Sequence, residues 1–124
     1  MTLPVQVPVQ KQVAVSRNYQ LLPDKALTEF ARKVIFAMHF NPNFAQSKSN
    51  INVLVRSVTE MEDRLNQRGM DNNLHNFHSL KTQRMEVLNH LHNLSKTVKE
   101  IAKNNPEQAS TIIKEAGFEC MPGL

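Results

Sequence analysis

The spacing of hydrophobic residues changes near residue 22, from alternation to the period of an α-helix. Residues 2–20 carry valines at alternate positions, at first separated by Gln and Pro; these are Val5, Val7, Val9, Val13 and Val15. The alternation predicts an extended segment with one apolar face. Pro4 and Pro8 exclude a central strand, because each lacks the N–H that pairing on both sides requires. We therefore expect an extended N-terminal arm over residues 1–21.

Three stretches after residue 22 repeat apolar residues every three or four positions, as amphipathic helices do. The first predicts a helix over residues 24–39, with Leu27, Phe30, Ala31, Val34, Ile35 and Met38 on its apolar face. The second is expected to begin at the N-cap Ser49 and to end at Gly69, with Ile51, Leu54, Val55, Val58, Met61 and Leu65. The third predicts a long helix over residues 72–103, with Leu74, Phe77, Leu80, Val87, Leu88, Leu91, Leu94, Val98 and Ile101.

A fourth, shorter helix has signals at both ends. Asn105, Pro106 and Gln108 have the order of an N-cap, a first-turn proline and a capping-box partner. Gly117 fits the left-handed position after the helix, and Phe118 would then contact the helix end in a Schellman motif. The inward positions are Ala109, Ile112, Ile113 and Ala116.

Four amphipathic helices with short links bury one another most simply as an up-and-down bundle. The predicted fold class is therefore all-α: an up-and-down four-helix bundle over residues 22–120, with the extended arm before it and a C-terminal tail over residues 121–124. A helical hairpin completed by another subunit is the alternative.

Several of these segments together resemble a known family. They are the stretch Leu22-Pro23-Asp24 with Leu27, the stretch Asn41-Pro42-Asn43-Phe44, the third helix with Lys81, Arg84 and Leu88, and Ala116-Gly117-Phe118. In this order they resemble a family of small four-helix bundle domains of unassigned function, often found beside fibronectin type III-like modules in bacterial or phage-derived proteins. The resemblance covers about residues 22–120 and implies a helical bundle. It implies no catalytic residue.

The composition excludes several fold classes and restricts the expected location of the protein. The 124 residues suit one domain, and three Gly with 6% aromatic residues argue against a β-sandwich and against a Gly-rich phosphate loop. A single cysteine, Cys120, excludes a disulfide within the chain and a cysteine-based zinc cluster. No apolar run is long enough for a membrane span, and the N-terminus lacks the features of a signal peptide. We therefore expect a virion or cytoplasmic location.

Candidate chemistry is sparse. His75 and His78 share a helical face, and Glu86 and His90 are four residues apart, but the Glu-x-x-His pattern of carboxylate-bridged bundle sites does not occur. The acidic run Glu60, Glu62 and Asp63 lies on a polar helix face, where charges are normally solvated, and Cys120 has no base within a motif. We expect no enzyme activity, no catalytic residue, no metal and no cofactor.

The charge and the arm leave binding and assembly as the expected functions. The net charge of +4 is scattered along the chain, and the basic residues nearest the turn between the second and third helices are Arg64, Arg68, Lys81 and Arg84. The favoured hypothesis is a structural subunit of a virion or similar multi-subunit particle, a homo- or hetero-oligomer whose five arm valines contact neighbouring subunits. The alternatives are a basic accessory protein that binds nucleic acid, for which only weak binding is expected, and a cytosolic protein-protein adaptor.

Overall fold

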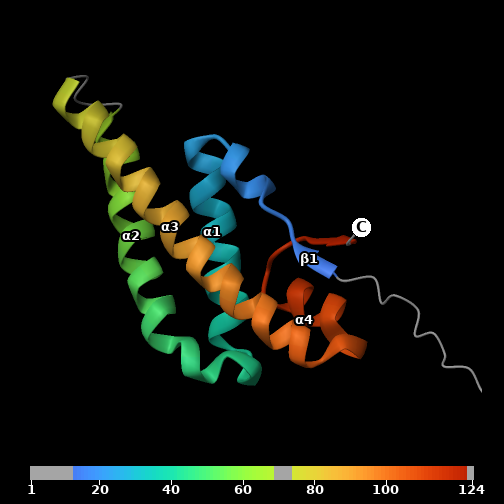
Figure 1. The fold of residues 1–124 in the computed structure, drawn as a ribbon. Helices are drawn as coiled ribbons and strands as arrows, with labels where there is room; N and C mark the ends of the chain where they lie inside the picture. The colour runs from blue at the N-terminus through green and yellow to red at the C-terminus, as the bar shows by residue number, and fades with distance from the viewer. Residues whose placement is uncertain (1–12, 69–73, 123–124) are drawn as a thin grey trace, which may run out of the picture.

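The computed structural model describes the backbone of residues 13–68 and 74–122 and the side chains of residues 14–66 and 80–121. These residues form an all-α helical bundle, as the sequence predicts (Figure 1). Four α-helices follow one another along the chain: α1 (Asp24–His39), α2 (Lys48–Arg68), α3 (Leu74–Asn104) and the short α4 (Ala109–Glu115).

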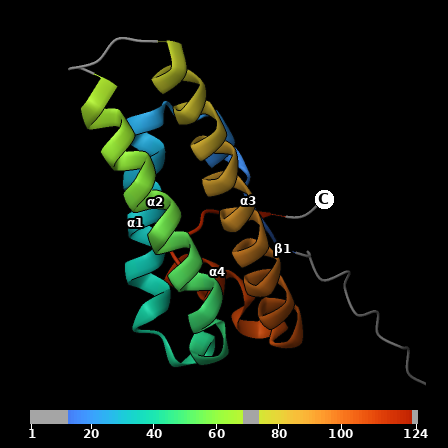
Figure 2. The ribbon, with the colours of Figure 1, turned by 90° about the vertical axis from the view of Figure 1, so that its left-hand side faces the viewer.

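Consecutive long helices run antiparallel, so α1 and α3 point in the same direction. α2 and α3 lie side by side in both views, and the end of this hairpin extends past the start of α1 (Figures 1 and 2). α3 has 31 residues and is therefore about 46 Å long at 1.5 Å per residue. Because of this length, α3 contacts α1, α2 and α4.

The core follows the predicted helical stripes. Every stripe residue whose side chain the structure describes is buried or half-buried, and Leu74 and Phe77 lie outside the described side chains. Three buried aromatic residues come from outside the stripes: Tyr19, from the predicted arm, Phe44, from the loop after α1, and Phe118, from the turn after α4. The helical period thus identified the helix faces but not the aromatic residues that close the ends of the core.

α1 has the predicted bounds, but α2 begins differently from the expectation. Residues Pro42–Ser47 form a 3-10 helix, η2, which passes directly into α2 at Lys48. The side-chain Oδ1 of Asn41 accepts a hydrogen bond from the Asn43 N–H at 2.9 Å at the start of η2. Ser49, predicted as the N-cap, therefore lies inside the helix, because η2 already supplies the preceding turn. α2 ends at Arg68, immediately before the predicted stop at Gly69.

The fourth helix, α4, ends as predicted, but its start differs from the prediction. Residues Pro106–Gln108 form a 3-10 helix, η3, and the Asn105 side chain donates to the Ile101 carbonyl at 2.9 Å instead of capping α4. The capping box is therefore absent from this start. At the other end Gly117 has a φ of +92°, and the Phe118 N–H donates to the Ile113 carbonyl at 3.3 Å. This is the predicted Schellman ending.

None of the helices in the described part of the chain has both the length and the apolar character of a membrane-spanning helix.

Candidate functional site

A two-stranded antiparallel ribbon joins the two ends of the described chain. Strand β1 (Val13–Val15) pairs with β2 (Cys120–Pro122), with Val13 opposite Pro122 and Val15 opposite Cys120. The Ser16 N–H donates to the Glu119 carbonyl at 2.8 Å and continues the pairing by one residue. The ribbon packs against α3 and α4. Residues 121 and 122, predicted as part of the C-terminal tail, therefore belong to the ribbon.

This ribbon corrects the interpretation of the last arm valines. Val13 and Val15 were expected to pack on a neighbouring subunit, because a helical body offers no sheet of its own. The C-terminal residues supply the missing strand, and Val15 is half-buried against the chain's own core. The expectation is wrong for Val15, and the backbone of Val13 pairs within the chain. Val5, Val7 and Val9 lie outside the described residues and stay a prediction.

The residues after β1 are also held by the body of the protein. Residues Asn18–Leu21 form a 3-10 helix, η1, whose Tyr19 is 3% exposed. The Tyr19 ring stacks on Phe30 of α1, with centroids 5.3 Å apart, and meets Phe118 edge-on at 6.0 Å. Aromatic pairs in these geometries add to the free energy gained by burial. The predicted boundary between arm and bundle at residue 22 is therefore too late, and we call residues 13–21 the strap.

Arg84 of α3 forms hydrogen bonds to the strap and to the first residue of α1. Its guanidinium donates to the Asp24 carboxylate at 3.0 Å and to the Gln20 carbonyl at 3.0 Å. The sequence interpretation grouped Arg84 with Arg64, Arg68 and Lys81 as a basic group for nucleic acid. In the structure the charge of Arg84 is neutralised within the chain. The contact explains why a basic residue interrupts the apolar stripe of α3.

A recess of about 300 Å³ lies between the strap and α3. Arg17 and Gln20 line it from the strap, and Met85, Leu88, Asn89 and His92 line it from α3. None of these six described residues is acidic. The sequence predicts only part of this site. The helical period places four residues on one side of α3: Met85, Leu88, Asn89 and His92. Arg17 is brought there by the strap, which the helical period does not predict.

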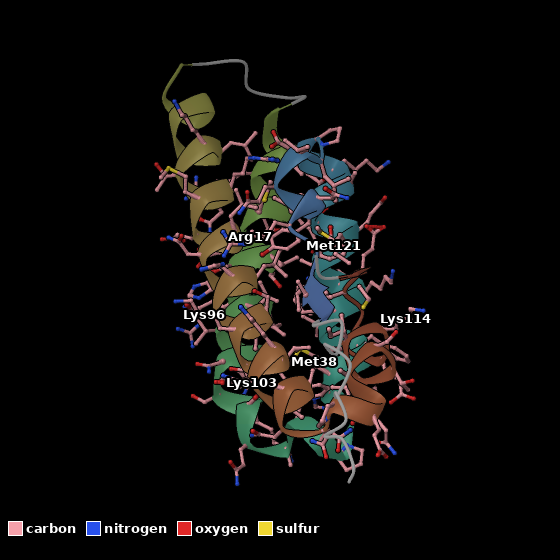
Figure 3. All side chains as sticks on the ribbon, turned by 45° about the vertical axis from the view of Figure 1, so that its right-hand side comes forward. Arg17, Met38, Lys96, Lys103, Lys114 and Met121 are labelled. Atoms are coloured by element: carbon pink, nitrogen blue, oxygen red, sulfur yellow. The ribbon has the colours of Figure 1, made fainter. Side chains whose placement is uncertain are left out.

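One charged side chain, that of Arg17, lines the recess, and its charge is positive. Burial lowers the pKa of His92, and the nearby Arg17 and Lys96 cations lower it further. The Nδ1 atom of His92 is buried and has no hydrogen-bond partner among the described residues. Figure 3 shows Arg17, Lys96 and Lys103 along the α3 side of the molecule, whereas Lys114 lies on the opposite side. Burial and these two cations together disfavour protonation of the His92 imidazole.

A larger recess of about 580 Å³ lies between η2 and the C-terminal half of α3. Lys96 and Glu100 line it together with the amide side chains of Asn43 and Gln46. Lys96 and Glu100 carry opposite charges, so together they give the wall of this recess no net charge. It therefore has less preference for an anion than the recess beside the strap.

Two exposed phenylalanines form a pair on α1 and just after it. Phe36 and Phe40 are each 69% exposed, and their rings meet edge-on with centroids 5.1 Å apart. The His39 ring packs against Phe40 at 4.8 Å. Neither phenylalanine belongs to the core, so the fold itself does not explain them. The sequence marks them only as apolar residues outside the predicted stripe.

The acidic run on α2 contains one structural contact that the sequence did not reveal. The Arg32 guanidinium of α1 donates to both carboxylate oxygens of Glu62, at 2.6 and 3.1 Å, and to the Thr59 hydroxyl at 3.0 Å. Hydrogen bonding to Glu62 raises the pKa of Arg32. Glu62 therefore joins α1 to α2 and is not a purely solvated charge, as had been expected of the whole run.

The remaining candidate residues are separate from one another. His39 is exposed, and the side chains of His75 and His78 lie outside the described residues. The Glu86 carboxylate accepts a hydrogen bond from Gln83 at 2.8 Å, and Cys120 is a half-buried free thiol in β2. No group of three His, Cys, Asp or Glu in the described part of the chain has a geometry that could hold a metal ion.

Comparison with known proteins returned no match to a family model, to a curated protein or to a solved structure. The resemblance to the four-helix bundle domain family therefore stays a prediction. Function has to be inferred from the geometry of the ribbon, the strap and the recess beside it.

Proposed function

We propose that this protein is a non-enzymatic structural subunit that associates with further copies of itself in a multi-subunit particle through its N-terminal segment. The observation that supports the proposal is the two-stranded ribbon, whose strand β1 begins at Val13. β1 pairs with β2 along one edge, and the sheet has no third strand among the described residues.

An edge of this kind favours the addition of another strand. The free edge of a β-strand presents unpaired N–H and C=O groups, and extended peptides bind to such edges through main-chain hydrogen bonds. Two-stranded ribbons are only marginally stable by themselves, so a third strand would add to the stability of this one. The ribbon is therefore a receptor for an extended segment.

The occupant that fits is residues 5–9 of a second copy. Val5, Val7 and Val9 give this segment one apolar face, and it has no charged side chain. Pro8 lacks one N–H, but a strand that pairs along a single edge tolerates this loss. The exposed apolar side chains of Leu21 and Met121, on the strap and on β2, offer surface for the valines.

The energetics favour an assembly of many copies. Full burial of three valines contributes at most about 5 to 9 kcal/mol. Ordering the segment costs about 1 to 2 kcal/mol per residue, which offsets most of this gain. The strap is already fixed by the Tyr19 cluster, so it adds no ordering cost of its own. Each contact is weak, and repetition over many subunits makes the whole stable.

The test uses charge substitutions on the two faces of the segment. Val7→Asp with Val9→Asp places two carboxylates on the apolar face, and Gln10→Asp with Gln12→Asp adds the same charge just after the segment, at positions that alternate with the valines. Sedimentation velocity of the full chain over a range of concentrations measures association. We expect wild-type chain and glutamine variant to form oligomers at high concentration, and the valine variant to stay monomeric. All three should melt alike by circular dichroism.

Two results would overturn the proposal. A wild-type chain that is monomeric throughout the range would exclude self-association through this segment. Equal association of the valine variant and the wild-type chain would place the contact elsewhere on the molecule, with the exposed Phe36 and Phe40 pair as the next surface to examine.

A further inference from the structure

Basic side chains that are scattered along the sequence lie together on one face of the structure. Lys96, Lys99 and Lys103 follow one another at spacings of three and four along α3, which places them on the same side of the helix. Lys81 lies about five full turns before Lys99 and therefore faces the same way. All four lysines are exposed, so this side of α3 faces solvent.

Arg17 of the strap lies beside the gap in this row of lysines. The part of α3 between Lys81 and Lys96 supplies no exposed lysine or arginine, and Arg17 lines the recess against that part of the helix. Figure 3 shows Arg17, Lys96 and Lys103 on the same side of the molecule. We use the name basic face for the five cations Arg17, Lys81, Lys96, Lys99 and Lys103.

The acidic residues of α3 lie at the margin of the basic face, toward α2 and η2. The Gln83 amide donates to the Glu86 carboxylate at 2.8 Å and to the Ser57 carbonyl of α2 at 3.3 Å, so Glu86 is on the α2 side. Glu100 lines the recess against η2, together with Lys96. None of the five cations forms an ion pair with a residue in the described part of the chain. Their charges are therefore available to a partner.

The basic face holds the charge excess of the described residues. Its five cations outnumber Glu86 and Glu100, the two acidic residues of α3. Among the remaining described side chains, basic and acidic residues are equal in number. Positive charge that gathers on one face is the electrostatic signature of a protein that binds a polyanion.

We infer that the basic face binds the phosphate backbone of double-helical nucleic acid, independently of its sequence. From Lys81 to Lys103 the face extends over about 33 Å, and one turn of duplex DNA is about 34 Å long. Lysine and arginine side chains contact phosphates, and each contact releases counterions from the nucleic acid. The exposed amides of Asn89 and Asn93 lie among the cations on α3 and can donate further hydrogen bonds to phosphate oxygens.

Two features favour a duplex over other polyanionic partners. Proteins that bind single strands stack the bases on aromatic side chains, but the exposed Phe36 and Phe40 belong to α1 and its C-terminal end. Helices that bind anionic membranes insert several large apolar residues, and Met85 is the one exposed large apolar residue of α3 among the described side chains. An acidic polypeptide is the competing outcome in the test.

The experiment is a titration of a fluorescent DNA duplex of about two helical turns with the full chain, followed by anisotropy at several salt concentrations. We expect a dissociation constant on the order of 10 to 100 µM at about 0.1 M salt. The logarithm of the association constant should fall against the logarithm of the salt concentration with a slope of about −3.6 to −4.5, as four or five phosphate contacts require.

The decisive variant replaces three lysines of the basic face by glutamine, and its control replaces three exposed lysines elsewhere. They are Lys96→Gln with Lys99→Gln and Lys103→Gln, and Lys25→Gln with Lys48→Gln and Lys114→Gln. We expect the first to bind at least about thirtyfold more weakly and to reduce the salt slope by about 2.7, and the control to stay within about threefold. Arg17→Gln alone should reduce the slope by about 0.9.

Two controls separate DNA binding from folding and from self-association. Thermal unfolding by circular dichroism confirms that each lysine variant keeps its fold. The valine and glutamine variants of the N-terminal segment add the same charge, so both should bind DNA equally well, whether or not the valine variant has lost self-association.

Four outcomes overturn the inference. The first is the absence of binding at about 50 mM salt, where phosphate contacts are strong. The second is an equal loss of affinity in the two lysine variants, which would show a response to net charge alone. The third is a single strand of the same length that binds more tightly than the duplex. The fourth is polyglutamate that competes as well as unlabelled duplex at equal charge, which would favour an acidic protein partner.

Discussion

Tyr19 decides whether the strap is part of the folded body or a detachable arm. Its ring is 3% exposed and contacts Phe30 and Phe118, so Tyr19→Ala leaves a cavity between η1, α1 and the end of α4. Truncation of a buried aromatic side chain to alanine typically costs about 3 to 5 kcal/mol. We expect Tyr19→Ala to lower the free energy of unfolding by that amount. Leu21→Ala, at an 84% exposed position two residues away, should change it by less than about 0.5 kcal/mol.

The assay is denaturant unfolding of the full chain at one low protein concentration, followed by far-ultraviolet circular dichroism. Hydrogen exchange at the Ser16 amide, which donates to the Glu119 carbonyl, reports the release of the ribbon. A cost below about 1 kcal/mol for Tyr19→Ala would contradict the reasoning. It would mean that residues 13–21 contribute little to folding and that the boundary near residue 22 is the correct one.

The Tyr19 hydroxyl adds a dependence on pH. Burial raises the pKa of Tyr19 above its ordinary value of 10.0, an effect partly opposed by the Ser95 hydroxyl and the Arg17 charge. The folded chain therefore keeps the phenol proton at pH values where the unfolded chain has released it. Its contribution to stability is complete below pH 10 and is lost as the pH rises through the folded-state pKa. Above pH 10 the wild-type chain should lose stability more steeply than Tyr19→Phe; parallel curves would contradict the assignment.

Two further substitutions test the ends of the core. Gly117→Ala should destabilise the chain by about 2 to 4 kcal/mol, because the residue is left-handed and a new Cβ would lie 3.0 Å from the Val34 Cα. Gly117→Asn should cost nearly as much, since asparagine tolerates the φ angle but not the crowding, and a cost for Asn below about 0.5 kcal/mol would exclude crowding. Phe44→Ala should cost about 3 to 5 kcal/mol and Phe40→Ala less than about 1.5 kcal/mol, measured by chemical denaturation. The reverse order would show that Phe40, not Phe44, supports the core.

The helices could be predicted because their signals are local. The bounds of α1 and the Schellman ending at Gly117 depend on residues within a turn or two of each position. The starts of α2 and α4 were mispredicted for one common reason. In both cases a 3-10 turn that begins at a proline precedes the helix, and it removes the need for the side-chain cap that Ser49 or Asn105 would have supplied.

The ribbon, the Tyr19 cluster and the recess beside the strap could not be predicted because their parts are distant in the sequence. β1 and β2 lie at opposite ends of the described chain, and Tyr19 meets Phe30 and Phe118 only after α4 has returned the chain to α1. One signal did point to the ribbon. Alternating valines require a strand to pair with, and the segment after Gly117, bounded by that glycine and by Pro122, was the other short segment able to extend.

The same strap positions all three features, so a change in one is expected to reach the others. β1 forms one strand of the ribbon, Arg17 comes directly after the ribbon, and Tyr19 anchors the next turn in the core. Loss of the Tyr19 anchor would therefore move Arg17 away from His92 as well as releasing β1. Loss of Ser16 amide protection together with a shift of the His92 ring signal in Tyr19→Ala, with neither change in Leu21→Ala, would show that the ribbon and the recess both depend on this anchor.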